Sequence, residues 1–137
     1  MVVDEERAAH PEARRSVLIA EQEERLRRDL GSLFDAEGYE TYLAGDDAAA
    51  FEIVHHRRID VVLVQLEIPH RGGLALLRAI RARSGAAVPC VLTAREVSGR
   101  VQVSAFLEDA FAVVPKPLDD ALLRRVVASA LRPRRRV

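Results

Sequence analysis

The chain has 137 residues, which is enough for one ordinary domain and too few for two. Apolar residues make up 49% and charged residues 31%, a balance that excludes a disordered chain and is typical of a globular domain. The formal net charge is zero and no apolar run is long enough for a membrane span, so neither nucleic acid nor a membrane is an expected partner. The single cysteine, Cys90, excludes an internal disulfide, and with no apolar signal sequence at the amino terminus we expect a reducing cytoplasm.

The first part of the chain predicts a strand, a helix and a second strand. Residues 1–15 carry mixed charges without a steady period and are interpreted as a flexible leader. In Ser16–Ala20 a continuous apolar run follows the serine and predicts a buried strand. Leucines then recur at helical spacing as far as Phe34, and Gly38 is expected to end this helix. Tyr39–Leu43 alternates polar and apolar residues, which favours a strand at the edge of a sheet.

The middle of the chain contains the most strongly apolar strand. Asp46 and its neighbours are suited to cap a helix that runs to about His56. Asp60–Leu66 then reads as a strand buried on both faces, because its apolar residues are continuous rather than alternating. This strand places Gln65 at its carboxyl end. A third helix is predicted over Leu74–Arg83.

The last part of the chain continues the alternation of strands and helices. In chain order the predicted elements are Val88–Leu92, Val97–Leu107, Phe111–Val114 and Leu118–Leu131. Cys90 falls in the first of these strands and is interpreted as a small buried hydrophobe. Residues 132–137 are interpreted as a basic tail or as the start of a linker. Five strands that alternate with five helices predict one α/β domain, residues 16–131, with a parallel sheet and helices on both faces.

Polar residues follow the predicted strands at the edge where a parallel sheet binds its ligands. The carboxyl ends of neighbouring strands open into one crevice in such a sheet. The residues delivered there are Glu21, Gln22, Gln65, Thr93 and Lys116. Of the 21 basic residues Lys116 is the only lysine, so it is a candidate for a role that a guanidinium group would fill poorly.

Five pieces of the sequence, in their order and spacing, resemble the receiver domain of bacterial two-component response regulators. They are Val17–Glu23, Asp60–Pro69, Gly73, Val91–Ala94 and Lys116–Pro117. The resemblance extends over about Ser16–Leu131. It implies a flavodoxin-like fold, in which a five-stranded parallel sheet of order 2-1-3-4-5 carries five helices on its two faces. It also implies that the peptide bond before Pro117 is cis.

The resemblance further implies phosphoryl transfer from a histidine kinase to an aspartate, but this chain has Gln65 at the aspartate position. Of the two acids that help to hold Mg²⁺ in the family, one falls on Glu21 and the other on Gln22. An uncharged amide is a poor nucleophile and has no route to an acyl phosphate. We therefore expect a receiver-like domain that lacks the phosphoacceptor.

The remaining functional positions of the family are kept in part. The hydroxyl residue and the lysine that contact the phosphoryl group fall on Thr93 and Lys116, whereas the aromatic switch residue falls on Val113. Glu21 and Lys116 together carry no net charge, so we expect no cofactor and weak or absent Mg²⁺ binding. Lys116 is predicted to pair with Glu21 or to donate a hydrogen bond to the Gln65 carbonyl.

The leading interpretation is a pseudo-receiver, a domain of two-component signalling that binds proteins and is not an enzyme. By resemblance, its partner surface lies on Val97–Leu107 and Leu118–Leu131, and the partner is a histidine kinase, an output domain or a second copy. The alternative is a working receiver with another acceptor, such as Glu67, or with control by a non-phosphate ligand. A small-molecule enzyme on this fold is disfavoured, because Ala20–Glu24 offers acids where a phosphate-binding loop requires glycine and hydroxyl groups.

Overall fold

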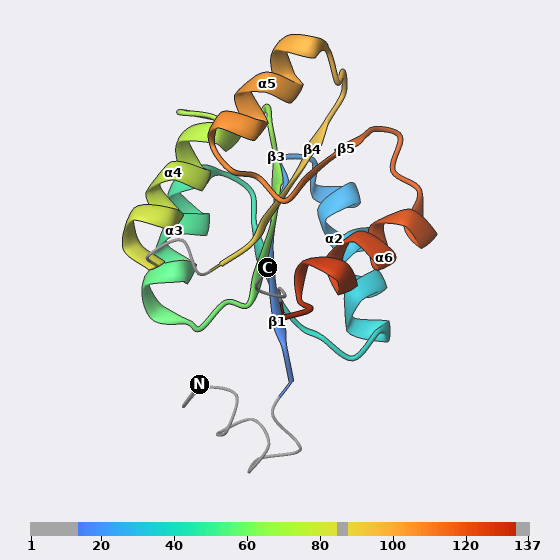
Figure 1. Ribbon diagram of the computed structural model, residues 1–137. Helices are drawn as coiled ribbons and strands as arrows, with labels where there is room; N and C mark the ends of the chain where they lie inside the picture. Colours follow the sequence, from blue (N-terminus) through green and yellow to red (C-terminus); the bar gives the residue numbers. More distant parts are fainter. Residues whose placement is uncertain (1–13, 85–87, 134–137) are drawn as a thin grey trace.

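A parallel sheet of five strands forms the centre of the protein (Figure 1). The computed structural model describes residues 14–84 and 88–133. In chain order the strands are β1 (Ser16–Ala20), β2 (Glu40–Ala44), β3 (Val61–Gln65), β4 (Cys90–Ala94) and β5 (Ala112–Pro115). The strand order is β2-β1-β3-β4-β5 and every pairing is parallel, which confirms the predicted sheet.

Five helices within the described residues cover the two faces of the sheet. Helices α2 (Glu24–Ala36) and α6 (Asp120–Ala130) lie on one face, to the right in Figure 1. The other face carries α3 (Asp47–His56), α4 (Gly73–Ser84) and, towards the top of the view, α5 (Gly99–Leu107). None of the helices in the described ranges combines the length and the apolar character that crossing a bilayer requires.

Strands β1 and β3 are apolar apart from one polar residue each, Ser16 and Gln65, because both faces of these strands are covered. Every residue of β1 and β3 is buried. Successive side chains of a strand point to opposite faces. Accordingly, Leu18 and Val62 pack in the core cluster under α3 and α4, whereas Ile19 and Leu63 pack in the cluster under α2 and α6.

Three of the helices begin at a side chain that accepts a hydrogen bond from the first turn. Asp46, Ser98 and Asp119 accept from the backbone N–H groups three residues later, at Ala49, Val101 and Leu122. These caps satisfy N–H groups that have no partner inside a helix. Gly38, with a φ of 91°, follows α2, as the sequence predicted.

The predicted element boundaries agree to within about two residues, and the largest error is in the fourth strand. The prediction of Val88–Leu92 was wrong at both ends, because β4 runs from Cys90 to Ala94. Pro89 has no N–H to donate, so only its carbonyl joins the ladder, accepting from the Val62 N–H at 3.0 Å. Thr93 consequently lies inside β4 rather than after it, paired in register with Gln65.

The remaining predictions agree more closely with the structure. Pro115 is the last residue of β5, one residue beyond the predicted end, and the peptide bond between Lys116 and Pro117 is cis, as expected. Cys90 is 1% exposed, which confirms that it is a buried residue of a strand. The predicted leader, residues 1–15, and the predicted tail, residues 132–137, lie outside the described residues apart from their two innermost positions.

Candidate functional site

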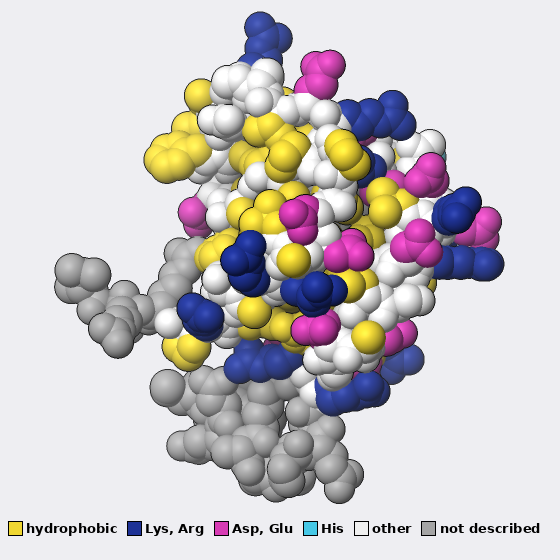
Figure 2. Space-filling view, turned by 90° about the vertical axis from the view of Figure 1, so that its right-hand side faces the viewer, with side chains coloured by type: hydrophobic (Ala, Val, Ile, Leu, Met, Phe, Trp, Pro, Cys, Tyr) yellow, Lys and Arg dark blue, Asp and Glu magenta, His cyan; other side chains and the backbone are white. Residues whose placement is uncertain are grey.

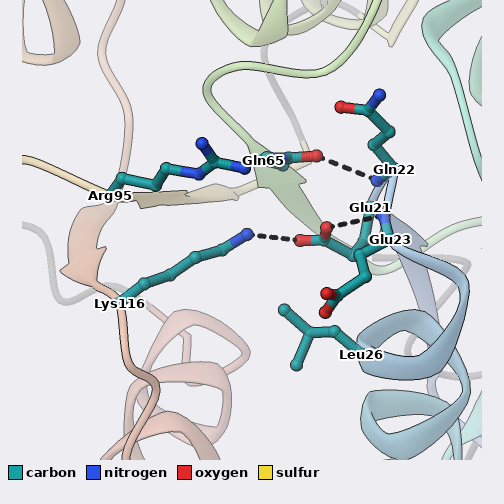
Figure 3. A pocket seen from close by; sticks show the side chains of 7 residues that line it. All are labelled: Glu21, Gln22, Glu23, Leu26, Gln65, Arg95 and Lys116. Atoms are coloured by element: carbon teal, nitrogen blue, oxygen red, sulfur yellow. Dashed lines mark hydrogen bonds and ion pairs between the residues drawn. The ribbon is translucent and has the colours of Figure 1, made fainter.

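The predicted crevice lies where β1, β3 and β5 end. In the sheet Gln65 is in register with Thr93 and Ala94 with Pro115, so the carboxyl ends of these strands are level. The ladder continues past the strands, because the Lys116 N–H donates to the Ala94 carbonyl at 2.8 Å. The crevice is a cavity of about 460 Å³ (Figure 3). Its lining consists of Glu21, Gln22, Glu23, Leu26, Gln65, Arg95 and Lys116.

An ion pair between Glu21 and Lys116 crosses this cavity. The Lys116 Nζ lies 3.0 Å from Glu21 Oε1, and the two side chains are 16% and 2% exposed. The other carboxylate oxygen, Oε2, accepts from the Glu23 backbone N–H at 2.9 Å. Figure 3 shows the two side chains pointing toward each other from opposite sides of the crevice. This confirms the predicted pairing of Lys116 with Glu21.

The Gln65 side chain is buried and faces the turn after β1. It is 3% exposed, and its Oε1 accepts the Gln22 backbone N–H at 2.8 Å. Of the two partners predicted for Lys116, Glu21 is the one that the structure shows, and the Gln65 oxygen accepts a backbone N–H. The Gln22 side chain itself is exposed and points away from the ion pair (Figure 3). The Gln22 position thus contributes to the site through its backbone rather than through its carboxamide.

Gly73 allows α4 to begin directly against the end of β3. A Cβ atom at this position would lie 2.5 Å from the Gln65 carbonyl oxygen and 2.9 Å from the Leu66 Cα. Both neighbours are backbone atoms, which cannot rotate away as a side chain can. The Gly73 N–H also donates to the Leu66 carbonyl at 2.9 Å. The position of Gln65 therefore depends on the absence of a side chain at residue 73.

Two arginines at the site were missed by the sequence analysis, which considered only residues at strand ends. Arg27 Nη1 donates to the carbonyls of Glu21, at 2.9 Å, and Gln22, at 3.1 Å, and so fixes the turn between β1 and α2. Arg95 is exposed and lines the cavity from the β4 side, and Figure 3 shows its side chain extending toward Gln65. The position of Arg95, two residues after Thr93, was the feature of the sequence that could have indicated its place at the cavity.

Three further predicted positions take different places. Thr93 is 2% exposed inside β4, and Val113 is half-buried against the core cluster under α3 and α4. Glu67 is exposed, and its Oε2 accepts from the Arg95 backbone N–H at 3.3 Å. The Glu67 carboxylate is thus tied to the loop after β4, and it does not line the cavity.

The donor set of the crevice is a poor fit for Mg²⁺. This ion prefers octahedral oxygen ligands, usually with one or two carboxylates. Both oxygens of Glu21 are already engaged, and the oxygen of Gln65 accepts an N–H. Within the part of the chain that the structure describes, no three His, Cys, Asp or Glu side chains lie together as a metal site would require.

Comparisons with known proteins agree on one family. A sequence model described as the response regulator receiver domain matches residues 17–128. The chain is 32% identical over 118 residues to the transcriptional activator protein PfeR of Pseudomonas aeruginosa, covering 80% of this chain and 38% of that protein. It is 30% identical over 115 residues to the regulatory protein AtoC of Escherichia coli, covering 84% of this chain and 25% of that protein. The match therefore spans well under half the length of these relatives.

Solved structures support the same fold. The chemotaxis protein CheY4 of Vibrio cholerae superimposes with a TM-score of 0.83 at 22% identity, over 87% of this chain and all of that one (100%). A CheY-like receiver domain protein from Methanospirillum hungatei gives a TM-score of 0.82 at 17% identity, over 87% of this chain and 94% of that one. At these identities the likeness concerns the fold alone.

Proposed function

The chain belongs to the response regulator receiver family, and from this premise we propose that it is a pseudo-receiver. In this proposal the domain keeps the receiver fold, does not accept a phosphoryl group, and acts by binding other signalling proteins. The observation that carries the proposal is the uncharged, buried side chain of Gln65 at the carboxyl end of β3. A role as a signalling domain rather than an enzyme, in the cytoplasm, completes the proposal.

The chemistry of phosphotransfer supports this reading of Gln65. Attack on phosphorus requires a carboxylate oxygen that carries negative charge and forms an acyl phosphate. The Gln65 Oε1 is a neutral amide oxygen, and its hydrogen bond from the Gln22 N–H, 2.8 Å long, draws electron density away from it further. Glu67, the alternative acceptor, is held by the Arg95 N–H outside the cavity lining. Neither group offers a reactive carboxylate to a donor in the crevice.

The electrostatics of the crevice support the expectation of weak or absent Mg²⁺ binding. A divalent cation would have to compete with Lys116, whose ammonium group already neutralises the Glu21 carboxylate at 3.0 Å. Breaking this pair to admit a metal ion would leave the ammonium group of a side chain that is only 16% exposed without its partner. We expect the crevice to stay closed by its own lysine at millimolar Mg²⁺.

The surfaces of α5 and α6 support a role in binding proteins. Large apolar side chains on these helices are exposed, and they fall within the predicted partner segments Val97–Leu107 and Leu118–Leu131. On the face that α2 and α6 share, acidic and basic side chains are interspersed among apolar ones (Figure 2). Such a mixed surface suits a protein partner better than nucleic acid, which requires an extended basic surface. A kinase, an output domain or a second copy fits this chemistry.

A direct test is to incubate the protein with acetyl phosphate and Mg²⁺ and to measure its intact mass at once under mild conditions. The proposal expects no change in mass, while an ordinary receiver in the same reaction gains one phosphoryl group. A gain of one phosphoryl group by this chain would refute the proposal and would favour the alternative, a working receiver with another acceptor. Peptide mapping would then assign the acceptor, with Glu67 as the first candidate.

A further inference from the structure

Strand β2 forms one edge of the sheet, and part of its backbone faces away from every other strand. The Glu40 N–H donates to the Arg15 carbonyl at 2.9 Å, so the backbone of Glu40 faces β1. The direction of the backbone groups alternates along a strand, which turns the N–H and C=O groups of Thr41 and Leu43 outward. Among the described residues none of these four groups has a backbone partner.

Strand β2 also lacks the features that protect the edge of a sheet from pairing. Natural sheets use short edge strands, prolines and lysines for this purpose. The opposite edge, β5, has four residues and ends at Pro115. Strand β2 has five residues without proline or lysine, and its only charged residue, Glu40, stands at the amino end. Leu43 is 41% exposed, so this edge offers apolar surface as well as backbone groups.

We propose that β2 pairs antiparallel with β2 of a second copy of the chain, which joins two sheets of five strands into one sheet of ten. A twofold axis perpendicular to the sheet would pass between Tyr42 of one copy and Tyr42 of the other. Thr41 then lies opposite Leu43 of the second copy, and each such pair exchanges two N–H···O=C hydrogen bonds. The inference goes beyond the proposed function, since it concerns neither the crevice nor α5.

The outward groups of β2 specify this register. Thr41 and Leu43 are the two outward residues within the strand, and the axis at Tyr42 gives each of them a partner of the other kind. A register that set Leu43 opposite Leu43 would leave Thr41 beyond the end of the partner strand. A patch that faces an identical patch is what a closed twofold dimer requires.

The charges of α2, which packs along β2, complement one another in the antiparallel arrangement. The first half of α2 lies at the carboxyl end of β2, because a Cβ atom on Gly45 would lie 3.1 Å from Arg27 Nη1. The end of α2 lies at the amino end of β2, where Asp35 Oδ1 accepts from the Thr41 hydroxyl at 2.6 Å. The twofold axis keeps both α2 helices on one face and brings the exposed Arg28 of each copy towards Asp35 of the other.

The size of the contact limits the strength of the dimer. Stable interfaces bury about 800 Å² on each partner, and one strand of five residues with the flank of a helix offers less. We therefore expect a dissociation constant of roughly 100 µM. Sedimentation equilibrium of the full chain up to millimolar concentration measures it. A chain that remains monomeric at that concentration overturns the proposal.

Amide hydrogen exchange locates the contact in the unaltered chain. The Thr41 and Leu43 amides face solvent in the monomer and should exchange rapidly, whereas the Tyr42 amide faces β1 and is protected at every concentration. In the dimer the two outward amides donate hydrogen bonds. Their exchange should therefore slow at least about threefold between dilute and millimolar protein. Exchange at Thr41 and Leu43 that does not depend on concentration overturns the proposal.

A charge placed on the edge separates this contact from the exposed face of α5. Leu43→Lys is expected to weaken the dimer at least about tenfold, because lysine on an edge strand opposes pairing. The matched control is Phe106→Lys on α5, at the upper end of the molecule in Figure 1, where the ring is 79% exposed. This variant should dimerise like the unaltered chain, and circular dichroism checks that both are folded. Equal effects of the two substitutions, or an effect of Phe106→Lys alone, overturn the proposal.

A charge reversal tests the direction of pairing. The ion pair of Arg28 with Glu24 is exposed on both sides, at 73% and 66%, and Glu37 is exposed just after α2. Arg28→Glu should raise the dissociation constant about threefold, and adding Glu37→Arg should restore it. Absence of any recovery overturns the antiparallel arrangement. The acetyl phosphate assay is independent of these tests: phosphate uptake by a dimeric chain refutes only the proposed function, and a monomeric chain without uptake refutes only this inference.

Discussion

Glu21 and Lys116 stand 95 positions apart in the sequence, yet their side chains meet at 3.0 Å and close the crevice from opposite sides. The glutamate is almost fully buried, and the lysine is the only one in the chain. A buried carboxylate that loses its cationic partner is left uncompensated in a region of low dielectric constant. The pair therefore makes a clear prediction for stability.

Lys116→Met should lower the free energy of unfolding by about 2 to 4 kcal/mol, because the Glu21 carboxylate stays buried without its partner. Urea denaturation measures this change. In the double variant Glu21→Gln, Lys116→Met no charge remains, and much of the lost stability should return. If the stability lost by the double variant equals the sum of the losses in the two single variants, Glu21 and Lys116 do not act as a pair.

Gln65→Asp restores the carboxylate that the family uses, and we expect slow, incomplete uptake of one phosphoryl group from acetyl phosphate. The uptake should be weak because Gln22 still provides no second acid and Lys116 still forms its ion pair with Glu21. Adding Gln22→Asp should raise the labelled fraction, as seen by intact mass with and without Mg²⁺. Gln65→Leu is the control and should never gain mass. Full labelling of the Gln65→Asp variant alone would show that residue 65 was the only barrier.

Gly73→Ala should be strongly destabilising, because the added Cβ would lie 2.5 Å from the Gln65 carbonyl oxygen. We expect a loss of about 2 to 4 kcal/mol in the free energy of unfolding, typical of overpacking against backbone. Gly99→Ala is the matched control, since no atom lies within 4 Å of a Cβ there. That variant should be neutral or up to about 1 kcal/mol more stable. Similar losses for the two variants would contradict the packing argument.

Burial raises the pKa of the Cys90 thiol from 9.0 to about 11, and the charge of Arg81 acts in the opposite direction with a smaller effect. The native thiol should therefore resist iodoacetamide at pH 8 and react only after unfolding. The folded protein keeps this proton up to about pH 11, whereas the unfolded chain loses it near pH 9. Stability from this group is thus present below pH 9 and falls as the pH rises to 11, by at most about 3 kcal/mol.

The difference in unfolding free energy between the unaltered chain and Cys90→Ala isolates the contribution of this thiol. That difference should be constant below pH 8 and should shrink by pH 10.5. The comparison is necessary because the pKa of Tyr39 is also raised, mainly by burial, so tyrosines titrate in the same range. Rapid alkylation of the native protein at pH 8 would contradict the burial of Cys90.

The sequence was sufficient for the parts of the fold that repeat a simple pattern. The continuous apolar run of β3 predicted a strand covered on both faces, and the parallel sheet then placed Gln65 and Lys116 at one edge. The boundary of β4 was misjudged because Val88 suits a strand, while the missing N–H of Pro89 delays the ladder. The ends of a strand depend on single hydrogen bonds, which the periodicity of apolar residues does not reveal.

The details of the crevice depended on geometry that the sequence does not contain. Two acceptors were plausible for Lys116, and only the fold shows that the lysine pairs with Glu21 while the Gln22 N–H donates to Gln65. Arg27 was hidden because its functional contact is made with backbone carbonyls, for which no residue type is diagnostic. The outward turn of Phe106 was equally hidden, since helical spacing alone does not say which face meets the sheet.

The internal lysine of the crevice has a consequence for how a cell could use the proposed pseudo-receiver. In the proposed pseudo-receiver Lys116 is the counter-ion of Glu21, so the domain would keep one conformation at any supply of magnesium or phosphodonor. The effect of such a domain on its partners would then follow its copy number. The cell would then regulate the effect of the domain through its synthesis and degradation rather than through its chemical modification.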